Sequence, residues 1–441
     1  MSERVHDLVG VGIGPFNLGL ACLAQPTGLD AVFLDRADGF RWHHGMMIEG
    51  ATIQVPFLAD LVTMADPASE FSFLNWLKHT GRLYPFYIRE SFYALRTEYD
   101  AYCRWAASRL PNLLWDHEVV GIAYEPAGDL YMVHAMRTDT GEERTIRARH
   151  VVVGVGTQPH VPVGLRDVAG RAVHSAEYLE NRDALRASGS ITIVGSGQSA
   201  AEIYRDLLDG ARADGYRLDW ITRSPRFFPM EYTKLTLEMT SPEYTDHFHR
   251  LPLSLRQRLG REQRSLYKGI SADLIDDIYD TLYRLSADGP VPTTLLTDTE
   301  VTAADWDGGG FRLSLRHGQL DQRHEHRTAS LVLATGYAAE TPPFLSGIAD
   351  RLDRDLLGRL DVARDYSVDG GRGRVFVQNG EEHTHGLTAP DLGFGAWRNS
   401  SILASITGRE VYPIERRIAF QEFGIPQSSR RSSRHATETA R

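Results

Sequence analysis

Two segments of this chain share one pattern, in which an apolar strand runs into a glycine-rich turn and then into a helix. The first reads VGVGIGPFNLGL (residues 9–20), and the second reads ITIVGSGQSAAE (residues 191–202). Glycines in such a turn let the backbone approach a phosphate, which binds the free N–H groups at the start of the helix. A chain that contains this unit twice is therefore expected to form an α/β protein with two dinucleotide-binding, Rossmann-like domains.

Strand and helix signals alternate along most of the 441 residues, a length sufficient for two or three domains. Residues 7–35 form one βαβ unit, and a second unit covers residues 191–222. Two further apolar segments, 151–155 and 330–335, predict strands, whereas residues 229–285 are polar and helical. The alternation predicts parallel sheets covered by helices.

In the first turn, Gly12 and Gly14 would allow a tight bend and a close approach to a pyrophosphate. Asp35 follows Gly12 by 23 positions, at the end of the next strand, where an acidic side chain can bind ribose hydroxyls. Asn17 occupies the position of the usual third glycine, which governs how closely helix and strand pack. Taken alone, this turn has an alternative interpretation as an ordinary strand-to-helix connection.

In the second turn, Gly195 and Gly197 are followed by Ala200, a small residue that suits the third position. The next strand ends at Thr222 and Arg223 instead of at an acidic residue. An arginine pairs with a 2′-phosphate, which a carboxylate would repel, so this turn predicts NADPH in preference to NADH. The alternative is a solvated arginine at a strand end.

Two fingerprints of different type in one chain have a joint chemical meaning. One would hold a flavin and the other the nicotinamide that reduces it, so the pair implies hydride transfer to a flavin. The segment ATGY (334–337), with Pro342 and Pro343 beyond it, resembles the point where two-dinucleotide flavoproteins return to the flavin domain. The predicted division is a flavin domain at 1–170 and 331–426, an inserted nicotinamide domain at 171–330 with a helical substrate region around 229–285, and a disordered tail at 427–441.

Composition excludes several other classes of protein. Lysine and arginine total 48 against 58 acidic residues, and a net charge of −10 argues against nucleic acid or an anionic membrane as partner. No apolar stretch approaches the roughly 18 residues of a membrane-spanning helix. Cys22 and Cys103 form no CxxC pair of a disulfide reductase, and residues 154–180 lack the FxGxxxHxxxW segment of Baeyer-Villiger-type monooxygenases. We expect a soluble, cytoplasmic protein with a small-molecule ligand.

Eight motifs follow one another along nearly the whole chain. They are GVGIGPFNLGL (10–20), WHHGMM (42–47), IQVPFLADLVT (53–63), FSFLNWL (71–77), RTEYDAYCRWA (96–106), GSGQSAAE (195–202), ATGY (334–337) and EHTHGL (382–387). In this order they resemble the flavin-dependent N-hydroxylating monooxygenases that act on lysine, ornithine or diamines in hydroxamate siderophore biosynthesis.

That resemblance implies a reaction. NADPH would reduce FAD, O2 would form a C4a-hydroperoxyflavin, and a terminal primary amine would attack its distal oxygen to give a hydroxylamine. The amine must be neutral to react, although only about one amine in 10³ is neutral at pH 7 in water. No catalytic base can be named, and members of the family often form dimers or tetramers, so we expect a homo-oligomer.

The resemblance also implies roles for particular residues. Those expected at FAD are Gly12, Gly14, Asn17, Asp35, Trp42, His43, Gln54, Arg96 and His385, with His43 and Gln54 beside the flavin ring. Those expected at NADPH are Gly195, Gly197, Gln198, Ser199 and Arg223. His383 and His385 have a metal-ligand spacing, but no further ligand cluster accompanies them, so no metal is expected. Trp76, Trp105 and the aromatic cluster from Tyr84 to Phe92 are assigned to the core.

The substrate prediction depends on one departure from the family pattern. Amino-acid hydroxylases of this family carry a lysine in place of Ala59, and that lysine pairs with the substrate α-carboxylate. An alanine suits a substrate without a carboxylate, such as cadaverine or putrescine, because an unpaired buried carboxylate is costly. The segments YKGIS (267–271), TAPDLGFGAWRNS (388–400) and IAFQEF (418–423) likewise resemble cadaverine hydroxylases of desferrioxamine-type pathways.

The far end of a diamine is an ammonium, so an acidic or polar partner should replace the lost lysine. Asp391 is the candidate, with Ala59 and Leu237 as further substrate residues; a carboxylate at a helix N-terminus is the alternative interpretation of Asp391. Two other functions stay open. One is hydroxylation of L-lysine or L-ornithine, with Lys234 or Lys268 as the cation, and the other is an uncoupled NADPH oxidase that only makes peroxide.

Overall fold

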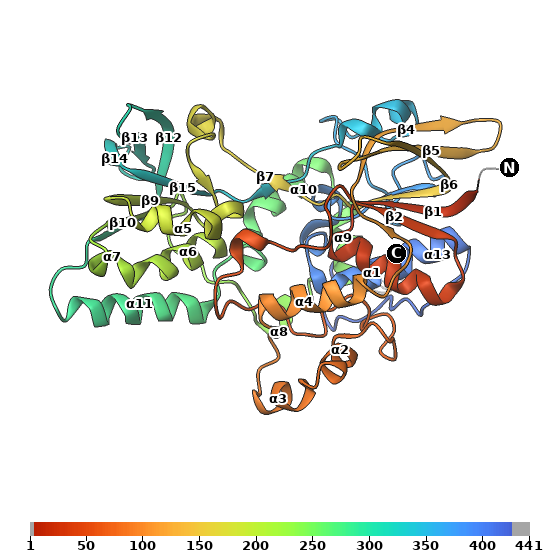
Figure 1. The fold of residues 1–441 in the computed structure, drawn as a ribbon, viewed down its shortest axis with the longest axis horizontal. Coiled ribbons are helices and arrows are strands. Elements are labelled where there is room, and N and C mark those ends of the chain that lie inside the picture. Colours follow the sequence, from red (N-terminus) through yellow and green to blue (C-terminus); the bar gives the residue numbers. More distant parts are fainter. Residues whose placement is uncertain (1–3, 426–441) are drawn as a thin grey trace, which may run out of the picture.

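The protein folds into two lobes, each built around its own β-sheet (Figure 1). The structure is a computed structural model that describes residues 4–425, so the tail expected at 427–441 lies outside the described residues. Strands of the larger sheet come from residues before 154 and after 374, and strands of the other parallel sheet come from residues 173–334.

The larger sheet has seven strands in the order β3-β2-β1-β6-β5-β4, with β17 paired to the end of β6. Strands β3, β2, β1, β6 and β17 run parallel, so their carboxyl ends lie along one edge, where ligands of such sheets bind. The bounds are β1 Val5–Val11, β2 Ala31–Leu34, β3 Leu113–Leu114, β4 His117–Glu125, β5 Leu130–Arg137, β6 Glu143–Val153 and β17 Val375–Val377.

The second sheet is parallel throughout, in the order β11-β10-β9-β15-β8. A three-stranded antiparallel sheet, β12-β13-β14, packs beside it. The bounds are β8 Val173–His174, β9 Ser190–Gly195, β10 Arg217–Ile221, β11 Thr293–Leu296, β12 Thr299–Trp306, β13 Phe311–His317, β14 Arg323–Thr328 and β15 Ser330–Ala334. The chain crosses between the lobes through an antiparallel pair, β7 (Gln158–Pro159) with β16 (Tyr337–Ala338).

Helices cover both sheets, as the alternating pattern predicts. Helix α1 packs against α4 and α13 in the first lobe, and α6 packs against α11 in the second. The bounds are α1 Pro15–Ala24, α2 Phe73–His79, α3 Leu83–Ile88, α4 Arg96–Ala107, α5 Tyr178–Arg186, α6 Gln198–Leu208, α7 Gly210–Ala213, α8 Lys234–Leu237, α9 Pro242–Arg250, α10 Leu253–Glu262, α11 Ala272–Ser286, α12 Glu382–His385 and α13 Gly395–Thr407. In the part of the chain described, none of these helices is both long and apolar enough to cross a membrane.

The aromatic cluster at 84–92 differs from the prediction. Trp76 lies in the core as expected, but Tyr84, Tyr87 and Phe92 are between 67% and 76% exposed. The reason is that α3 is only six residues long and projects with α2 from the body of the first lobe (Figure 1). The assignment to the core holds for Phe86, which packs against Phe57 and Phe73, and is wrong for the exposed aromatic residues, because residue type alone does not reveal whether a helix is covered.

Candidate active site

The first glycine turn connects β1 to α1 at the carboxyl edge of the larger sheet. Gly12 has φ +87°, and a Cβ built on it would lie 2.6 Å from the carbonyl oxygen of Gly154, so both conformation and space require glycine there. Gly14 is extended and opens α1, and a Cβ built on it would meet no atom within 4 Å. The free helix N-terminus therefore faces open space that a pyrophosphate can enter.

Asn17 supports this turn from inside the protein. Its side chain is fully buried, and its Nδ2 donates to the carbonyl oxygens of Val11 (3.2 Å) and Gly12 (2.8 Å). Its Oδ1 accepts from Nε2 of Gln378 (2.8 Å), which follows β17. A Cβ built on Gly154 would lie 2.6 Å from Asn17 Cγ, so the asparagine fills the close contact that a third glycine would leave open.

Asp35 follows β2 and is half-buried. Its Oδ2 accepts from the Ile13 N–H (2.7 Å), and its Oδ1 accepts from the Ala37 N–H (2.9 Å). The carboxylate thus ties the end of β2 to the glycine turn, and its expected role at the ribose stays a prediction.

The residues expected at the flavin ring, Trp42, His43 and Gln54, lie on the loop between β2 and α2. Trp42 contacts His43 and Tyr99, each at 4.9 Å between ring centroids. The surrounding protein lowers the pKa of His43 to about 4, and the nearby Arg96 and His44 act in the same direction. Gln54 Nε2 is buried without a hydrogen-bond partner among the described residues, while its backbone oxygen accepts from the Tyr232 hydroxyl (2.6 Å). A buried amide without a partner is expected of a group that binds a cofactor.

The second glycine turn connects β9 to α6 and is equally tight. A Cβ built on Gly195 would lie 2.4 Å from the carbonyl oxygen of Ala334, and Gly197 opens α6 in an extended conformation. Gln198, the first residue of α6, accepts from the Ser271 N–H (2.8 Å), and Ser199 follows it, half-buried. These contacts hold the helix N-terminus in place for a second pyrophosphate.

Arg223 lies just beyond β10 and is exposed. Within residues 4–425 it forms no ion pair, so its guanidinium is available to a 2′-phosphate. Arg96 forms a bidentate ion pair with Glu202 in the other lobe (2.7 Å for both hydrogen bonds), and its expected position near FAD stays a prediction.

Ala59 and Asp391 approach the same point from distant parts of the chain. A Cβ built on Gly393 would lie 3.0 Å from Asp391 Oδ1 and 3.6 Å from Ala59 Cβ. Asp391 also accepts from the Gly393 N–H (2.6 Å), and burial raises the pKa of its carboxyl group. Leu237 is 46% exposed on α8.

The two lysines considered as alternative cations lie in different settings. Lys268 Nζ is paired with Glu382 Oε2 at 2.9 Å, and Glu382 also accepts from the Tyr267 hydroxyl. Lys234 is exposed at the start of α8. Lys268 is thus already engaged by a carboxylate of the protein.

A buried polar cluster that the sequence analysis missed lies beside the segment that carries Asp391. Glu381 and Arg398 are both fully buried and form an ion pair at 3.1 Å. Arg398 Nη2 donates to the carbonyl oxygens of Thr388 (3.0 Å) and Ala389 (2.6 Å), so it holds the chain just before Asp391. Arg398 lies in the segment 388–400 and Glu381 directly precedes the motif at 382–387, but only the tertiary structure shows that they form a charged pair in the interior.

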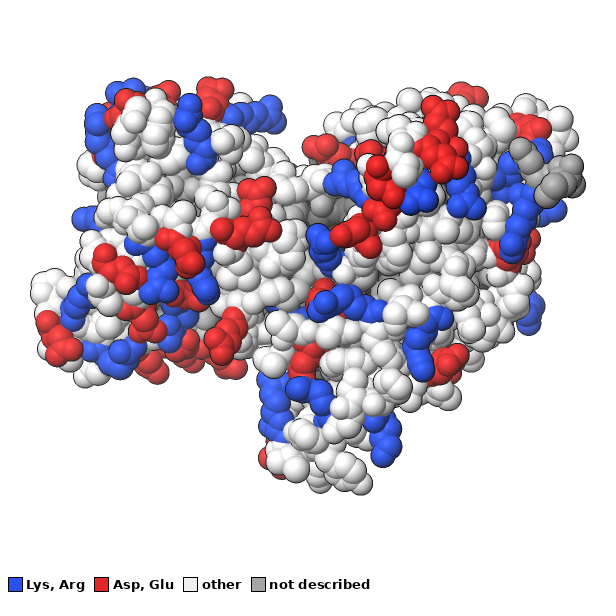
Figure 2. Space-filling view, in the orientation of Figure 1, with Lys and Arg blue, Asp and Glu red and all other residues white. Residues whose placement is uncertain are grey.

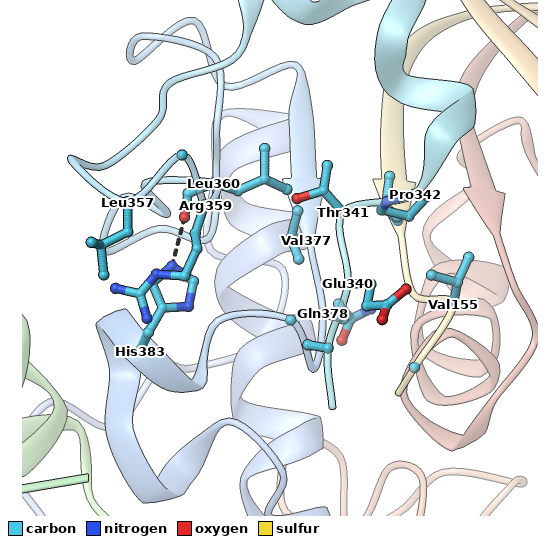
Figure 3. A pocket seen from close by; sticks show the side chains of 15 residues that line it. Val155, Glu340, Thr341, Pro342, Leu357, Arg359, Leu360, Val377, Gln378 and His383 are labelled. Atoms are coloured by element: carbon cyan, nitrogen blue, oxygen red, sulfur yellow. Dashed lines mark hydrogen bonds between the residues drawn. The ribbon is translucent and has the colours of Figure 1, made fainter. Parts of the chain in front are cut away.

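His385 and His383, which have a metal-ligand spacing in the sequence, contact different residues. His385 is fully buried and stacks on Tyr366 at 4.6 Å, and burial lowers the pKa of its imidazole well below the usual value. His383 Nε2 instead bonds to the Leu360 carbonyl oxygen at 2.8 Å (Figure 3).

A cavity of about 170 Å³ opens where β6 and β17 end, between His383 and the segment 339–342 (Figure 3). Gln378 lines it, and its Oε1 has no hydrogen-bond partner among the described residues. The cavity therefore lies along the carboxyl edge of the sheet, on the same strands that support the first glycine turn.

Two tight glycine turns each follow a strand that lies among parallel neighbours, one turn beside an acidic strand end and one beside an arginine. This arrangement defines a flavoprotein with separate sites for FAD and NADPH. Gln54 Nε2 and Gln378 Oε1, each buried without a hydrogen-bond partner among the described residues, and the open N-terminus of α1 fit a bound cofactor at the first site.

Comparison with known proteins gives the family. The chain belongs to the L-lysine 6-monooxygenase/L-ornithine 5-monooxygenase family, whose model matches residues 4–339. It is 47% identical to the putrescine N-hydroxylase of Shewanella oneidensis, over 96% of this chain and 85% of that protein.

Solved structures agree in fold. The FAD-bound cadaverine monooxygenase DfoA of Erwinia amylovora is 50% identical, with a TM-score of 0.95 over 96% of this chain and 99% of that one. The ornithine N-hydroxylase KtzI of Kutzneria sp. 744, with reduced FAD, NADP+ and L-ornithine, is 30% identical, with a TM-score of 0.85 over 92% and 99%. The predicted fold, enzyme class and cofactors are confirmed: the chain is a flavin-dependent N-hydroxylating monooxygenase that uses FAD and NADPH.

Proposed function

We propose that this enzyme hydroxylates one terminal amine of an aliphatic diamine, cadaverine or putrescine, as a step in hydroxamate siderophore biosynthesis. The observation that carries the proposal is the convergence of Ala59 and Asp391 beside Gly393. An alanine offers no cation to a substrate carboxylate, and a carboxylate beside it suits an ammonium. The putrescine N-hydroxylase and the cadaverine monooxygenase among the relatives support the same class of substrate.

The two ends of a diamine require opposite environments. The far end stays an ammonium and pairs with Asp391, a charge-assisted contact that stabilises binding by about 1.5–3 kcal/mol. The reacting end must lose its proton, which a desolvated site favours because burial disfavours a charged amine. The chain therefore holds one end by charge and presents the other to the oxidising centre.

The cofactors would be held by the residues of the two turns. The backbone of Gly12 and Gly14 would hold FAD, with Gln54 donating to it from a buried position. The α6 N-terminus and Arg223 would hold NADPH. When bound, FAD reduced by NADPH supplies the activated oxygen, and the protein's part is to orient the amine and exclude water.

The test is hydroxylamine formation by the enzyme with FAD and NADPH on cadaverine, putrescine, L-lysine and L-ornithine. We expect the diamines to exceed both amino acids by at least tenfold in kcat/KM, about 1.4 kcal/mol in transition-state binding. A preference for L-lysine would contradict the proposal, and so would NADPH oxidation that no amine converts into hydroxylamine.

We further propose that the enzyme works in the cytoplasm as a homo-oligomer. Its domains would divide near the predicted bounds, except that the return to the FAD domain follows β15 (Ser330–Ala334), which belongs to the second sheet. Two buried free cysteines suit a reducing compartment. The exposed aromatic side chains of α3 and Phe92 form an apolar surface of the kind that a second copy covers. Charges of both signs alternate over the face in Figure 2, as expected for a protein whose partners are small molecules.

A further inference from the structure

A buried ion pair crosses the boundary between the two lobes. Arg96 begins α4 in the FAD lobe, and Glu202 lies on α6 in the NADPH lobe. The guanidinium and carboxylate form two parallel hydrogen bonds of 2.7 Å, and their side chains are only 12% and 7% exposed. This is the fork-to-fork geometry that fixes direction as well as distance.

The pair is continuous with the NADPH turn. Glu202 Oε1 also accepts from Nε2 of Gln198 at 2.8 Å, and Gln198 directly follows the last glycine of the turn. Gln198 Oε1 in turn accepts from the Ser271 N–H, next to the start of α11. One carboxylate thus contacts both the other lobe and the helix end that would bind the pyrophosphate.

The pair is equally continuous with the flavin side. Arg96 Nη1 donates to the Met46 carbonyl oxygen (3.2 Å), and its backbone N–H donates to the Ala51 carbonyl oxygen (2.9 Å). Met46 and Ala51 lie on the segment between Trp42 and Gln54, the residues expected at the flavin. The network therefore connects the wall of one cofactor site to the turn of the other.

Two other ion pairs are more exposed, and the second of them joins α9, which packs against α12, to the FAD lobe. Lys268 and Glu382 are 38% and 42% exposed, and Arg364 and Asp246 are 28% and 49% exposed. Exposed ion pairs contribute little to orientation because solvent screens them. Removal of one partner from a buried pair is strongly destabilising, because it leaves an unpaired charge in the interior. A buried pair is no more stabilising than apolar residues of the same size, so its presence indicates a geometric role.

We infer that Arg96 and Glu202 are positioning residues that set the NADPH lobe at the orientation required for hydride transfer to FAD. The hydride would carry two electrons from NADPH, which becomes NADP+, to FAD, which becomes reduced, and the reacting atoms must approach to about 3–3.5 Å. The inference rests on the FAD- and NADPH-dependent activity of the family and is independent of the proposed diamine.

The primary variant is Glu202→Gln, which keeps the shape and the Gln198 contact but removes the charge. We expect anaerobic flavin reduction by saturating NADPH to slow at least tenfold, with FAD affinity unchanged. In the enzyme without NADPH, amide hydrogen exchange should speed up at residues 42–51 and at the start of α6. Both lose a buried polar contact, whereas the apolar contacts of Met46 and Ile48 with the NADPH lobe remain. A reduction rate within twofold of the parent with unchanged exchange would overturn the inference.

A double variant, Arg96→Gln with Glu202→Gln, separates positioning from stability. The single variant leaves Arg96 buried without its counter-ion, so its Tm should fall, whereas the double variant should recover Tm because no unpaired charge remains. We expect flavin reduction to stay slow in the double variant. Recovery of the rate together with Tm would show that the pair serves stability alone.

The matched control is Asp246→Asn, which removes a more exposed ion pair between α9 and the FAD lobe. In this variant NADPH should reduce the flavin at the parental rate, and hydrogen exchange should equal that of the parent. A decrease in the rate of flavin reduction equal to that of Glu202→Gln would overturn the special role of the buried pair. Flavin reduction needs no amine, so this experiment remains decisive if the diamine proposal fails.

Discussion

At the scale of single residues, charge and exposure decide which side chains can contact ligands. Asp391 lies beside Ala59, and burial raises the pKa of its carboxyl group. Arg223 is exposed with its guanidinium available, whereas Arg96 and Lys268 are occupied by Glu202 and Glu382. The basic side chains therefore fall into two groups: Arg96 and Lys268 pair with carboxylates of the protein, and Arg223 is left for a ligand.

Asp391→Asn is expected to raise KM for cadaverine and putrescine by about tenfold to 150-fold, which corresponds to about 1.5–3 kcal/mol. The kcat at saturating diamine should change little, because the lost contact is made in both ground and transition states. In the parent enzyme, KM should rise as pH falls and Asp391 is protonated, and the variant should lose this rise. Asp183→Asn, at a side chain that is 96% exposed, is the control; equal KM values in both variants would contradict the role of Asp391.

Arg223→Ser should weaken NADPH binding by about 1.5–3 kcal/mol and leave NADH binding nearly unchanged, since only NADPH has the 2′-phosphate. The measurement is KM for each nucleotide during flavin reduction. Arg186→Ser, on α5 of the same lobe, removes an arginine paired with Asp214 and should not change the preference. A preference for NADPH that survives in Arg223→Ser would mean that another group binds the 2′-phosphate.

At the scale of elements, the two strand-turn-helix units share a shape but differ in their support. The first turn is tied by Asn17 to β1 and to Gln378 beyond β17, while the second is tied by Gln198 to the start of α11. Each helix N-terminus is thus held by a side chain from within its own turn. The two glycines of the first turn differ in role, because Gly12 is needed for the backbone to fold and Gly14 leaves space for a ligand.

Gly12→Ala and Gly14→Ala separate these two roles. Gly12→Ala should destabilise the folded protein by several kcal/mol, because its φ is +87° and the new Cβ would lie 2.6 Å from Gly154 O. Gly14→Ala should fold with nearly parental Tm, since nothing lies within 4 Å of its Cβ, yet bind FAD at least tenfold more weakly. Thermal unfolding and FAD titration of the apoenzyme measure both effects, and parental FAD affinity in Gly14→Ala would place the pyrophosphate elsewhere.

At the scale of the whole molecule, many histidines are packed as neutral groups. The pKa is lowered, chiefly by burial, for His150, His174, His326, His383 and His385. Their ordinary value is 6.5, so in weakly acidic solution the unfolded chain binds more protons than the folded one. Stability from these groups is present above pH 6.5 and is lost as pH falls below it.

The free energy of unfolding of the apoenzyme should therefore decrease between pH 7.5 and pH 5.5. The slope should approach about 1.4 kcal/mol per pH unit for each histidine that stays neutral in the folded state. Urea unfolding at the two pH values measures it, with salt concentration held constant. Equal or greater stability at pH 5.5 would show that these histidines are protonated in the folded protein or that carboxyl groups outweigh them.

The sequence by itself determined the class of fold, the two cofactor turns and the family, because those signals are local. Glycine spacing and apolar runs act through backbone conformation within a few residues, so Gly12, Gly14, Gly195 and Gly197 could be interpreted without a structure. Only the tertiary structure showed that Arg96 faces Glu202, that Glu381 pairs with Arg398, and that the α3 aromatics are exposed. Those contacts join residues far apart in the chain or depend on what covers an element, and packing, not local sequence, decides both.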